Sequence, residues 1–84
     1  MNSIDIANTL LIKLRNGKVG FAYRTKGGRT RFALGTLKPR YTPNNYVEGK
    51  PLQVVTSYTD CVTYWDLQKK GWRRCCVGNI LFII

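Results

Sequence analysis

Residues 61–84, CVTYWDLQKKGWRRCCVGNILFII, carry the densest structural signal in the chain. Aromatic and β-branched residues over 62–65 are followed by a polar turn at 68–71, a second run over 72–77 and an apolar end. This order is typical of a β-hairpin followed by a closing strand. A four-residue turn places one ion pair and two apolar pairs on one face, as cross-strand pairing prefers. The facing residues are then Leu67 with Trp72, Asp66 with Arg73, Tyr64 with Cys75, and Val62 with Val77.

A Gly27-Gly28 dipeptide marks an earlier hairpin, between KVGFAYRTK (18–26) and RTRFALGTL (29–37). A two-residue Gly-Gly turn accepts the positive φ angles of a type I′ turn and sets the register of the strands. In that register the large apolar residues all lie on one face, so the turn and the pattern agree. The facing residues are Tyr23 with Phe32, Phe21 with Leu34, and Val19 with Thr36.

The opposite face of this hairpin has Arg24 across from Arg31, with Lys26 and Arg29 beside the turn and glycine and alanine further along. Like charges directly opposite each other destabilise a sheet. A phosphate bound between the two facing arginines would remove the repulsion, and the small residues would leave room for a ribose or a base. The alternative is that the small residues let a bent barrel strand or a helix pack closely while the arginines are solvated.

Residues 3–15 have apolar residues at helical spacing. Ser3 is placed to cap the first turn, and Asp5 suits the positive end of the helix dipole. We therefore expect a short amphipathic helix, with a β-strand over 9–14 as the alternative because Ile12 interrupts the stripe. The stripe consists of Ile4, Ala7, Leu11 and Leu14, with Leu10 beside them.

Residues 38–60 break the pattern with prolines, an Asn-Asn pair and a glycine, which predicts a long loop with one short strand over 53–58. Long loops in compact domains are often binding elements, and this one interleaves aromatic rings with positive charge, as single-stranded nucleic-acid grooves do. The alternative is a tolerated insertion whose tyrosines pack back onto the domain. The residues concerned are Lys38, Arg40, Tyr41, Tyr46 and Lys50.

The chain has 84 residues, 44% of them hydrophobic, which suits a single small domain. Lys and Arg number 14 against 4 Asp and Glu, so the net charge is +10. Such an excess repels itself in the compact state and indicates a polyanionic partner. The plainer interpretation is that the charge only keeps a small protein soluble.

The sequence contains no pattern of residues that indicates catalysis or the binding of a metal or cofactor. There is no histidine, the four carboxylates are scattered, and no serine or cysteine has an evident activating partner, so we expect no enzyme activity. Three cysteines, an odd number, do not form a disulfide framework. Cys75 and Cys76 are adjacent, so in a strand their side chains point to opposite faces and do not easily bridge. The cysteine spacing also lacks a C-x-x-C metal motif. Reduced thiols in a cytoplasmic protein are the simpler interpretation. The N-terminus lacks the pattern of a secretory signal, and no apolar stretch approaches the ~20 residues that span a bilayer.

The expected elements are one helix within 1–17 and strands at about 19–25, 30–37, 61–67, 72–77 and 80–84, and their order is that of an Sm-like SH3 barrel. The run VTYWDLQKKGWRRCCVGNI resembles the small stand-alone WYL-like proteins, an Sm-type SH3-barrel family of gut bacterial genomes and their phages. The family's ending typically has an aromatic-Asp-Leu strand, a short charged turn, Trp-Arg and a closing Asn-Leu or Asn-Ile. FALGTL at 32–37 resembles its second strand. The matching positions are Trp65, Asp66, Leu67, Trp72, Arg73, Asn79 and Ile80.

The resemblance implies a mainly β domain over residues 1–84, a small Sm-like SH3 barrel of about five antiparallel strands with a short N-terminal helix and a loop insertion at 38–60. Larger WYL domains are ligand-sensing modules of transcriptional regulators and defence systems, and they bind nucleic acid or nucleotides through basic side chains around the barrel. Their last hairpin usually ends in a Phe-Arg-x-Asp-Arg-Ile-like run. This chain has CCVGNI at 75–80, so both family arginines are missing and other cations would have to hold an anion.

Two functions of different classes follow. The first is a non-catalytic nucleic-acid- or nucleotide-binding barrel, in which a tryptophan stacks a base, although packing at a barrel end is the alternative for one tryptophan. The second is a phage or mobile-element module that binds, and inhibits, a host protein through its basic face or a sheet edge, with oligomerisation through strand edges. Sequestration of a small nucleotide is a third. The residues proposed for the first function, besides the cations and tyrosines of the 38–60 loop, are Arg24, Lys26, Arg29, Arg31, Lys69, Lys70, Arg73, Arg74, Trp65 and Trp72.

Overall fold

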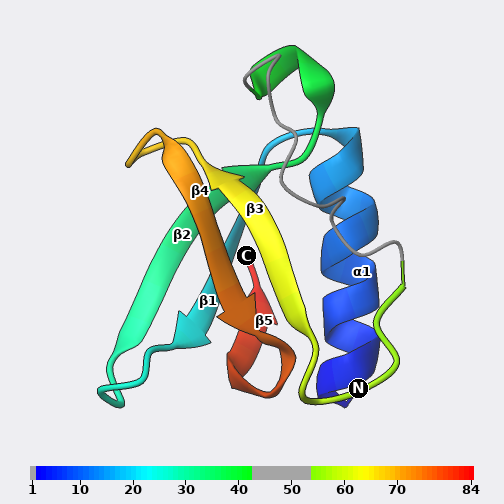
Figure 1. The fold of residues 1–84 in the computed structure, drawn as a ribbon, viewed down its shortest axis with the longest axis vertical. Helices are drawn as coiled ribbons and strands as arrows, with labels where there is room; N and C mark the ends of the chain where they lie inside the picture. The colour runs from blue at the N-terminus through cyan, green and yellow to red at the C-terminus, as the bar shows by residue number, and fades with distance from the viewer. Residues whose placement is uncertain (1, 43–53) are drawn as a thin grey trace.

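The computed structural model describes residues 2–42 and 54–84 as one helix packed against a single curved sheet (Figure 1). The sheet has five strands in the order β4-β3-β2-β1-β5, and every neighbouring pair is antiparallel. This confirms the mainly β fold with one N-terminal helix. No helix in the described part of the chain is long and apolar enough to cross a membrane. The elements are α1 (Ser3–Asn16), β1 (Val19–Arg24), β2 (Thr30–Thr36), the 3₁₀ turn η1 (Pro39–Tyr41), β3 (Cys61–Asp66), β4 (Gly71–Cys76), the 3₁₀ turn η2 (Val77–Asn79) and β5 (Ile80–Ile83).

Helix α1 forms where the apolar stripe predicts it, which excludes the alternative strand. Its N-cap is Asn2 rather than Ser3, because the Asn2 Oδ1 accepts a hydrogen bond from the Asp5 backbone N–H at 2.9 Å. Ile12 points to solvent, with 54% of its surface exposed, so it does not interrupt the buried side of the helix. The buried residues of α1 are Ala7, Leu10, Leu11 and Leu14.

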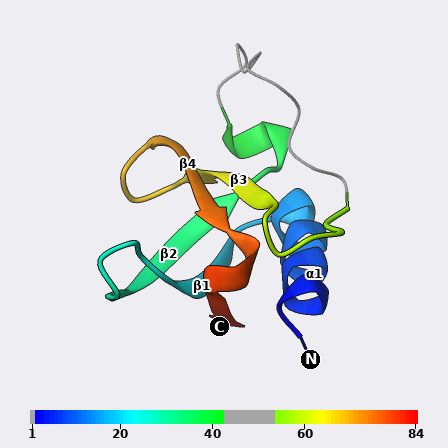
Figure 2. The ribbon, with the colours of Figure 1, turned by 60° about the horizontal axis from the view of Figure 1, so that its bottom comes forward.

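The segment before β3 has no strand over its described residues 54–58, so the short strand expected there is not formed. It runs beside α1, as Figures 1 and 2 show. The Asn8 side chain attaches it to the helix by donating to the Val55 carbonyl at 3.0 Å and accepting from the Val55 N–H at 2.6 Å. Val55 is thereby buried in the core. A side-chain amide replaces the sheet partner that this segment lacks.

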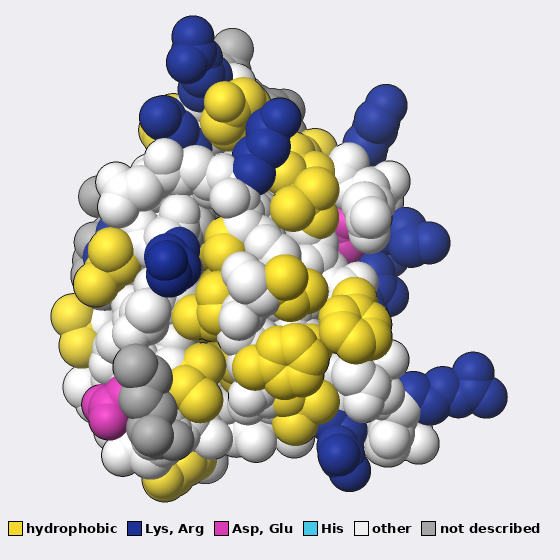
Figure 3. Space-filling view, turned by 180° about the vertical axis from the view of Figure 1, so that it is seen from behind, with side chains coloured by type: hydrophobic (Ala, Val, Ile, Leu, Met, Phe, Trp, Pro, Cys, Tyr) yellow, Lys and Arg dark blue, Asp and Glu magenta, His cyan; other side chains and the backbone are white. Residues whose placement is uncertain are grey.

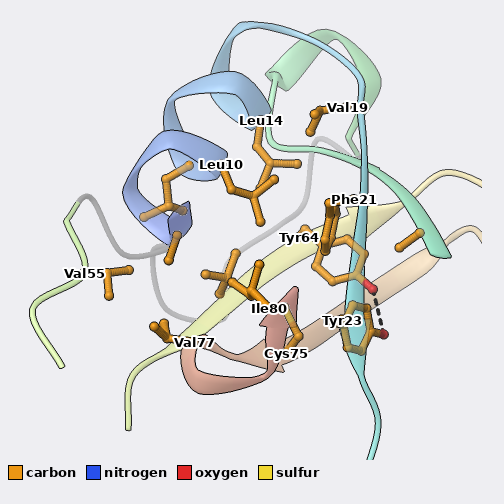
Figure 4. Close-up of a cluster of buried hydrophobic side chains, with 14 residues drawn as sticks. Leu10, Leu14, Val19, Phe21, Tyr23, Val55, Tyr64, Cys75, Val77 and Ile80 are labelled. Atoms are coloured by element: carbon orange, nitrogen blue, oxygen red, sulfur yellow. Dashed lines mark hydrogen bonds between the residues drawn. The ribbon is translucent and has the colours of Figure 1, made fainter. Parts of the chain in front are cut away.

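The core lies between α1 and the inner side of the sheet (Figure 4). Tyr64 of β3 is fully buried at its centre and meets Phe21 of β1 edge to face, with ring centroids 5.0 Å apart. The phenol oxygens of Tyr64 and Tyr23 form a hydrogen bond of 3.1 Å across the core. Burial and this bond raise the pKa of Tyr64. The polar ends of both rings are therefore satisfied inside an apolar cluster.

The register of the β1–β2 hairpin differs by one residue from the expected one. The loop has three residues, 26–28, because the Thr25 N–H donates to the Arg29 carbonyl at 2.8 Å, and only Gly28 has a positive φ, +84°. A one-residue shift turns every side chain of one strand to the other side of the sheet. The facing residues are Val19 with Gly35, Gly20 with Leu34, Phe21 with Ala33, Ala22 with Phe32, Tyr23 with Arg31, and Arg24 with Thr30.

A contact between the neighbouring strands β2 and β3 explains this register. Gly35 faces inward against Tyr64, and a Cβ at this position would lie 2.6 Å from the Tyr64 Cδ2. Only glycine allows the buried ring to approach β2 so closely. With Gly35 inward, alternate residues of β2 face the same way, so Phe32 and Leu34 face outward instead of joining the core as expected.

The β3–β4 hairpin is shifted by two residues from the expected register. Its turn comprises residues 67–70, because the Asp66 Oδ1 accepts from the backbone N–H groups of Gln68 and Lys69, each at 2.9 Å. A shift of two keeps each residue on its side of the sheet, so the expected inward face is preserved. The facing residues include Asp66 with Gly71, Trp65 with Trp72, Tyr64 with Arg73, and Val62 with Cys75.

Candidate functional site

The expected phosphate clamp between Arg24 and Arg31 is wrong. These residues are not opposite each other, because Arg24 faces Thr30 and Arg31 faces Tyr23. Their side chains leave the sheet on opposite sides, and the Arg31 Nη2 donates to the Asp66 Oδ2 at 3.1 Å. The charge of Arg31 is therefore committed inside the molecule.

Asp66 holds one end of the barrel together. Its carboxylate is fully buried, accepts two turn amides through Oδ1, and binds Arg31 through Oδ2. The Arg73 Nε lies 3.7 Å from the same Oδ2, so the expected Asp66–Arg73 ion pair forms, although diagonally rather than directly across the strands. Two arginines thus share one buried carboxylate, and we assign Asp66, Arg31 and Arg73 a structural role.

The outer side of the sheet carries an exposed pair of phenylalanine rings. Phe32 of β2 and Phe82 of β5 both pair with Ala22 of β1, one from each side. Ala22 between them is fully buried, whereas Phe32 is 61% exposed and Phe82 47% exposed. Their centroids are 6.2 Å apart at an interplanar angle of 61°. We call these two rings with Ala22 the aromatic platform.

Further apolar side chains extend this surface. Leu34 lies two residues beyond Phe32 on the same side of β2, and the 73% exposed Ile84 follows Phe82 and packs its Cδ1 against Gly20. Seen from behind, the molecule has hydrophobic side chains gathered over the middle of one face, while most Lys and Arg side chains stand out around its margin (Figure 3). Apolar surface rimmed by polar groups is the form that a binding surface takes.

Cations lie directly beside the platform. Arg24 follows Ala22 by two residues on β1, so it is on the same side of the sheet, roughly 7 Å further along. Lys26 and Arg29 are in and beside the loop that follows. All three residues are exposed, and within residues 2–42 and 54–84 none of them forms an ion pair. Their charge is available to a ligand.

Of the cations proposed on the β3–β4 hairpin, only some are available to a ligand. Lys69 and Lys70 are exposed in the turn, and Arg74 is exposed on the outer side of β4 opposite Thr63, whereas Arg73 leans on Asp66. The indoles of Trp65 and Trp72 face each other on the outer side, edge to face, with centroids 5.3 Å apart. Both are half-buried, so packing against each other accounts for much of their surface.

The described part of the 38–60 loop brings Lys38, Arg40 and Tyr41 together around η1. The ring of Tyr41 already has a cation of this chain over it, since the Lys18 Nζ lies 4.7 Å from the ring centroid. This contact was not expected from the sequence. Tyr46 and Lys50, which were expected to contribute to the same surface, lie outside the described residues.

The aromatic platform is the candidate binding surface that the sequence did not predict. Residues 30–36 alternate in a way that fits either face, and a Gly-Gly dipeptide fits loops of two or three residues. The apolar end of the chain was expected to close the sheet or to serve, with a free strand edge, in oligomerisation and protein docking, and not to contribute an aromatic ring to a nucleic-acid site. The available signal was Gly35, whose lack of a side chain suits the inward face of a barrel better than an exposed row.

The thiols and carboxylates offer no metal centre in the part of the chain that the structure describes, where no three such side chains gather. Cys75 points into the core, and burial raises the pKa of its thiol to about 12. This thiol stays protonated and unreactive at neutral pH.

A protein-family model described as WYL_2, Sm-like SH3 beta-barrel fold, matches residues 7–81. The matched region includes both hairpins, most of α1 and the start of β5. Comparisons with curated proteins and with solved structures give no significant match.

Proposed function

The chain belongs to the WYL_2 family of Sm-like SH3 β-barrels, and from that premise we propose that it binds nucleic acid without catalysing a reaction. Bases stack on Phe32 and Phe82, and phosphates contact Arg24, Lys26 and Arg29. The observation that carries the proposal is the aromatic platform, two exposed rings on a sheet face with unpaired cations beside them.

The chemistry of the two groups suits one partner. Stacking a base on an aromatic ring contributes about 1–3 kcal/mol and requires no particular base, because every base has a π-face. Arginine and lysine beside the rings bind the phosphates that connect successive bases. A net charge of +10 adds a long-range attraction to any polyanion. The platform and the cations together therefore favour a nucleic acid over an uncharged partner.

The nucleic acid is single-stranded in this proposal. Bases in a duplex are stacked on each other and present only their edges, so they cannot lie on Phe32 or Phe82. A single strand across the sheet can place a base on the platform and its phosphate at Arg24. We therefore expect a labelled single-stranded oligonucleotide to bind more tightly than the corresponding duplex.

The test is the salt dependence of this binding, measured by fluorescence anisotropy. With three phosphate contacts, the affinity for a single strand falls roughly 20-fold between 50 and 200 mM salt. Arg24→Gln should reduce that slope, and Lys13→Gln is the matched control, because it removes one exposed charge from α1 instead. An affinity that is the same at both salt concentrations, or a slope that both variants reduce equally, would contradict the proposal.

A protein-interaction module is the second candidate function. Strands β4 and β5 end the sheet, so each leaves one row of backbone groups for a further strand, and β5 also exposes Phe82. A host protein docked on either edge strand would be recovered in a pull-down after nuclease treatment. A partner that is held only through a bound nucleic acid would be lost. The two candidate functions are thereby separated.

A further inference from the structure

Two cysteine thiols face each other across the β3–β4 hairpin. Cys61 and Cys76 are direct partners in the strand register, on the outer side of the sheet, and their Sγ atoms are 4.0 Å apart. Both thiols are reduced, Cys76 is exposed and Cys61 is half-buried. The nucleic-acid proposal uses neither of them.

Their position in the ladder suits a covalent bond. The adjacent pair, Asp60 and Val77, is a hydrogen-bonded pair, because the Val77 N–H donates to the Asp60 carbonyl at 2.9 Å. Pairs alternate along an antiparallel ladder, so Cys61 and Cys76 form a non-hydrogen-bonded pair, with Cα atoms about 4.5 Å apart. Disulfides span Cα separations from about 4.4 to 6.8 Å. A Cα separation of about 4.5 Å lies within that range, so the position of the two residues in the ladder is compatible with a bond between their sulfurs.

We propose that Cys61 and Cys76 are a reversible thiol-modification site, at which a small-molecule disulfide such as oxidised glutathione closes a cross-strand disulfide. The exposed Cys76 thiolate attacks the small disulfide, forming a mixed disulfide and releasing one thiolate. The Cys61 thiolate then attacks the Cys76 sulfur, forms the Cys61–Cys76 bond and releases the second. Two protein thiols are oxidised and one disulfide is reduced to two thiols, so electrons and atoms balance.

The third thiol takes no part, because Cys75 points to the other side of the strand and is buried in the core. Burial, the neighbouring Cys76 thiol and the Asp60 carboxylate raise the pKa of Cys61, while Arg74 acts in the opposite direction. The second, ring-closing step therefore accelerates as the pH rises toward the thiol pKa. The closed bond ties edge strand β4 to β3 at the end of the hairpin opposite the 67–70 turn.

The experiment oxidises the reduced full chain in a buffer of oxidised and reduced glutathione and measures intact mass and peptide masses. We expect the main product to be a monomer that has lost two hydrogens, about tenfold more abundant than the glutathione adducts. Dithiothreitol should reduce its disulfide and restore the original mass. Cleavage after Arg74 leaves both Cys75 and Cys76 on one peptide, so fragment ions between these residues show which of them is bonded to Cys61.

Cys61→Ser and Cys76→Ser are the matched variants, each at a position outside the buried core. Each should stop at one glutathione adduct on the remaining outer thiol. Stable adducts on both outer thiols of the unmodified chain, a bond through Cys75, or a covalent dimer in place of the closed monomer would overturn the proposal. The readout on the unmodified chain does not depend on whether a variant folds.

Discussion

At the scale of single residues, the Asp66 carboxylate connects three parts of the sheet, the 67–70 turn, β2 and β4. One buried carboxylate accepts two backbone amides of the 67–70 turn and an arginine of β2, and it lies beside a second arginine of β4. It therefore fixes both the register of the β3–β4 hairpin and the direction in which Arg31 points.

We predict that Asp66→Asn lowers the free energy of unfolding by about 2–3 kcal/mol, as measured by urea denaturation. The amide keeps the shape but loses the charge, so the partly buried Arg31, with a side chain 28% exposed, is left without a counter-charge. Asp5→Asn, an exposed carboxylate in the first turn of α1, should cost no more than about 1 kcal/mol. Equal losses of unfolding free energy in the two variants would show that the Asp66 charge does not stabilise this end of the sheet.

Cys75 predicts a pH dependence of stability. The thiol ionises in the unfolded chain from about pH 9, its ordinary value, but in the folded protein only near pH 12. Between these values the unfolded state binds fewer protons, so this group makes the free energy of unfolding fall as the pH rises. The stability difference between the unmodified chain and Cys75→Ala, measured at about pH 8 and about pH 10.5, should therefore shrink at the higher pH. A difference that stays constant would contradict the burial of this thiol.

At the scale of elements, the loop of the β1–β2 hairpin decides which face of β2 is exposed. A two-residue type I′ turn needs positive φ at both glycines, whereas the three-residue loop needs it only at Gly28. We predict that Gly28→Ala lowers the free energy of unfolding by about 1 kcal/mol, and that Gly27→Ala changes it by no more than about 0.5 kcal/mol. Similar losses of stability at both positions would instead indicate a two-residue turn, in which Phe32 lies on the inner face of the sheet.

The helix and the two hairpins were predictable because their signals are local, whereas the short strand expected over 53–58 is not formed over its described residues 54–58. Helix α1 follows from an apolar stripe, and both hairpins follow from turn residues between β-forming runs. The registers were not predictable, because they depend on contacts between residues far apart in sequence. Gly35 must accommodate the Tyr64 ring, and Asp66 must close a turn while it binds Arg31.

The same distinction explains the candidate site. The cations Arg24, Lys26 and Arg29 were identified from composition and from their place near a turn, which a small register error does not change. The ring of Phe32 was missed because a one-residue shift exchanges the two faces of a strand. Phe82 was missed because no register was predicted for β5, the apolar closing strand. A binding surface on a sheet is therefore only as predictable as the register of its strands.

At the scale of the whole molecule, charge and shape act together. A chain of net charge +10 draws a polyanion to any part of its surface. Among residues 2–42 and 54–84, only one face of the sheet combines unpaired cations with exposed phenylalanine rings. The central claim is that this face, and not the charge alone, binds single-stranded nucleic acid.

The most direct test measures the affinity of a fluorescent single-stranded oligonucleotide for Phe32→Ala, with Ile12→Ala as the control. Ile12 is 54% exposed on α1, so its replacement removes a comparable exposed apolar group and leaves the charge unchanged. We predict that Phe32→Ala weakens binding about tenfold, the loss of one stacked base, while Ile12→Ala binds as the unmodified chain does. Equal affinities for the two variants, with both folded, would contradict the account.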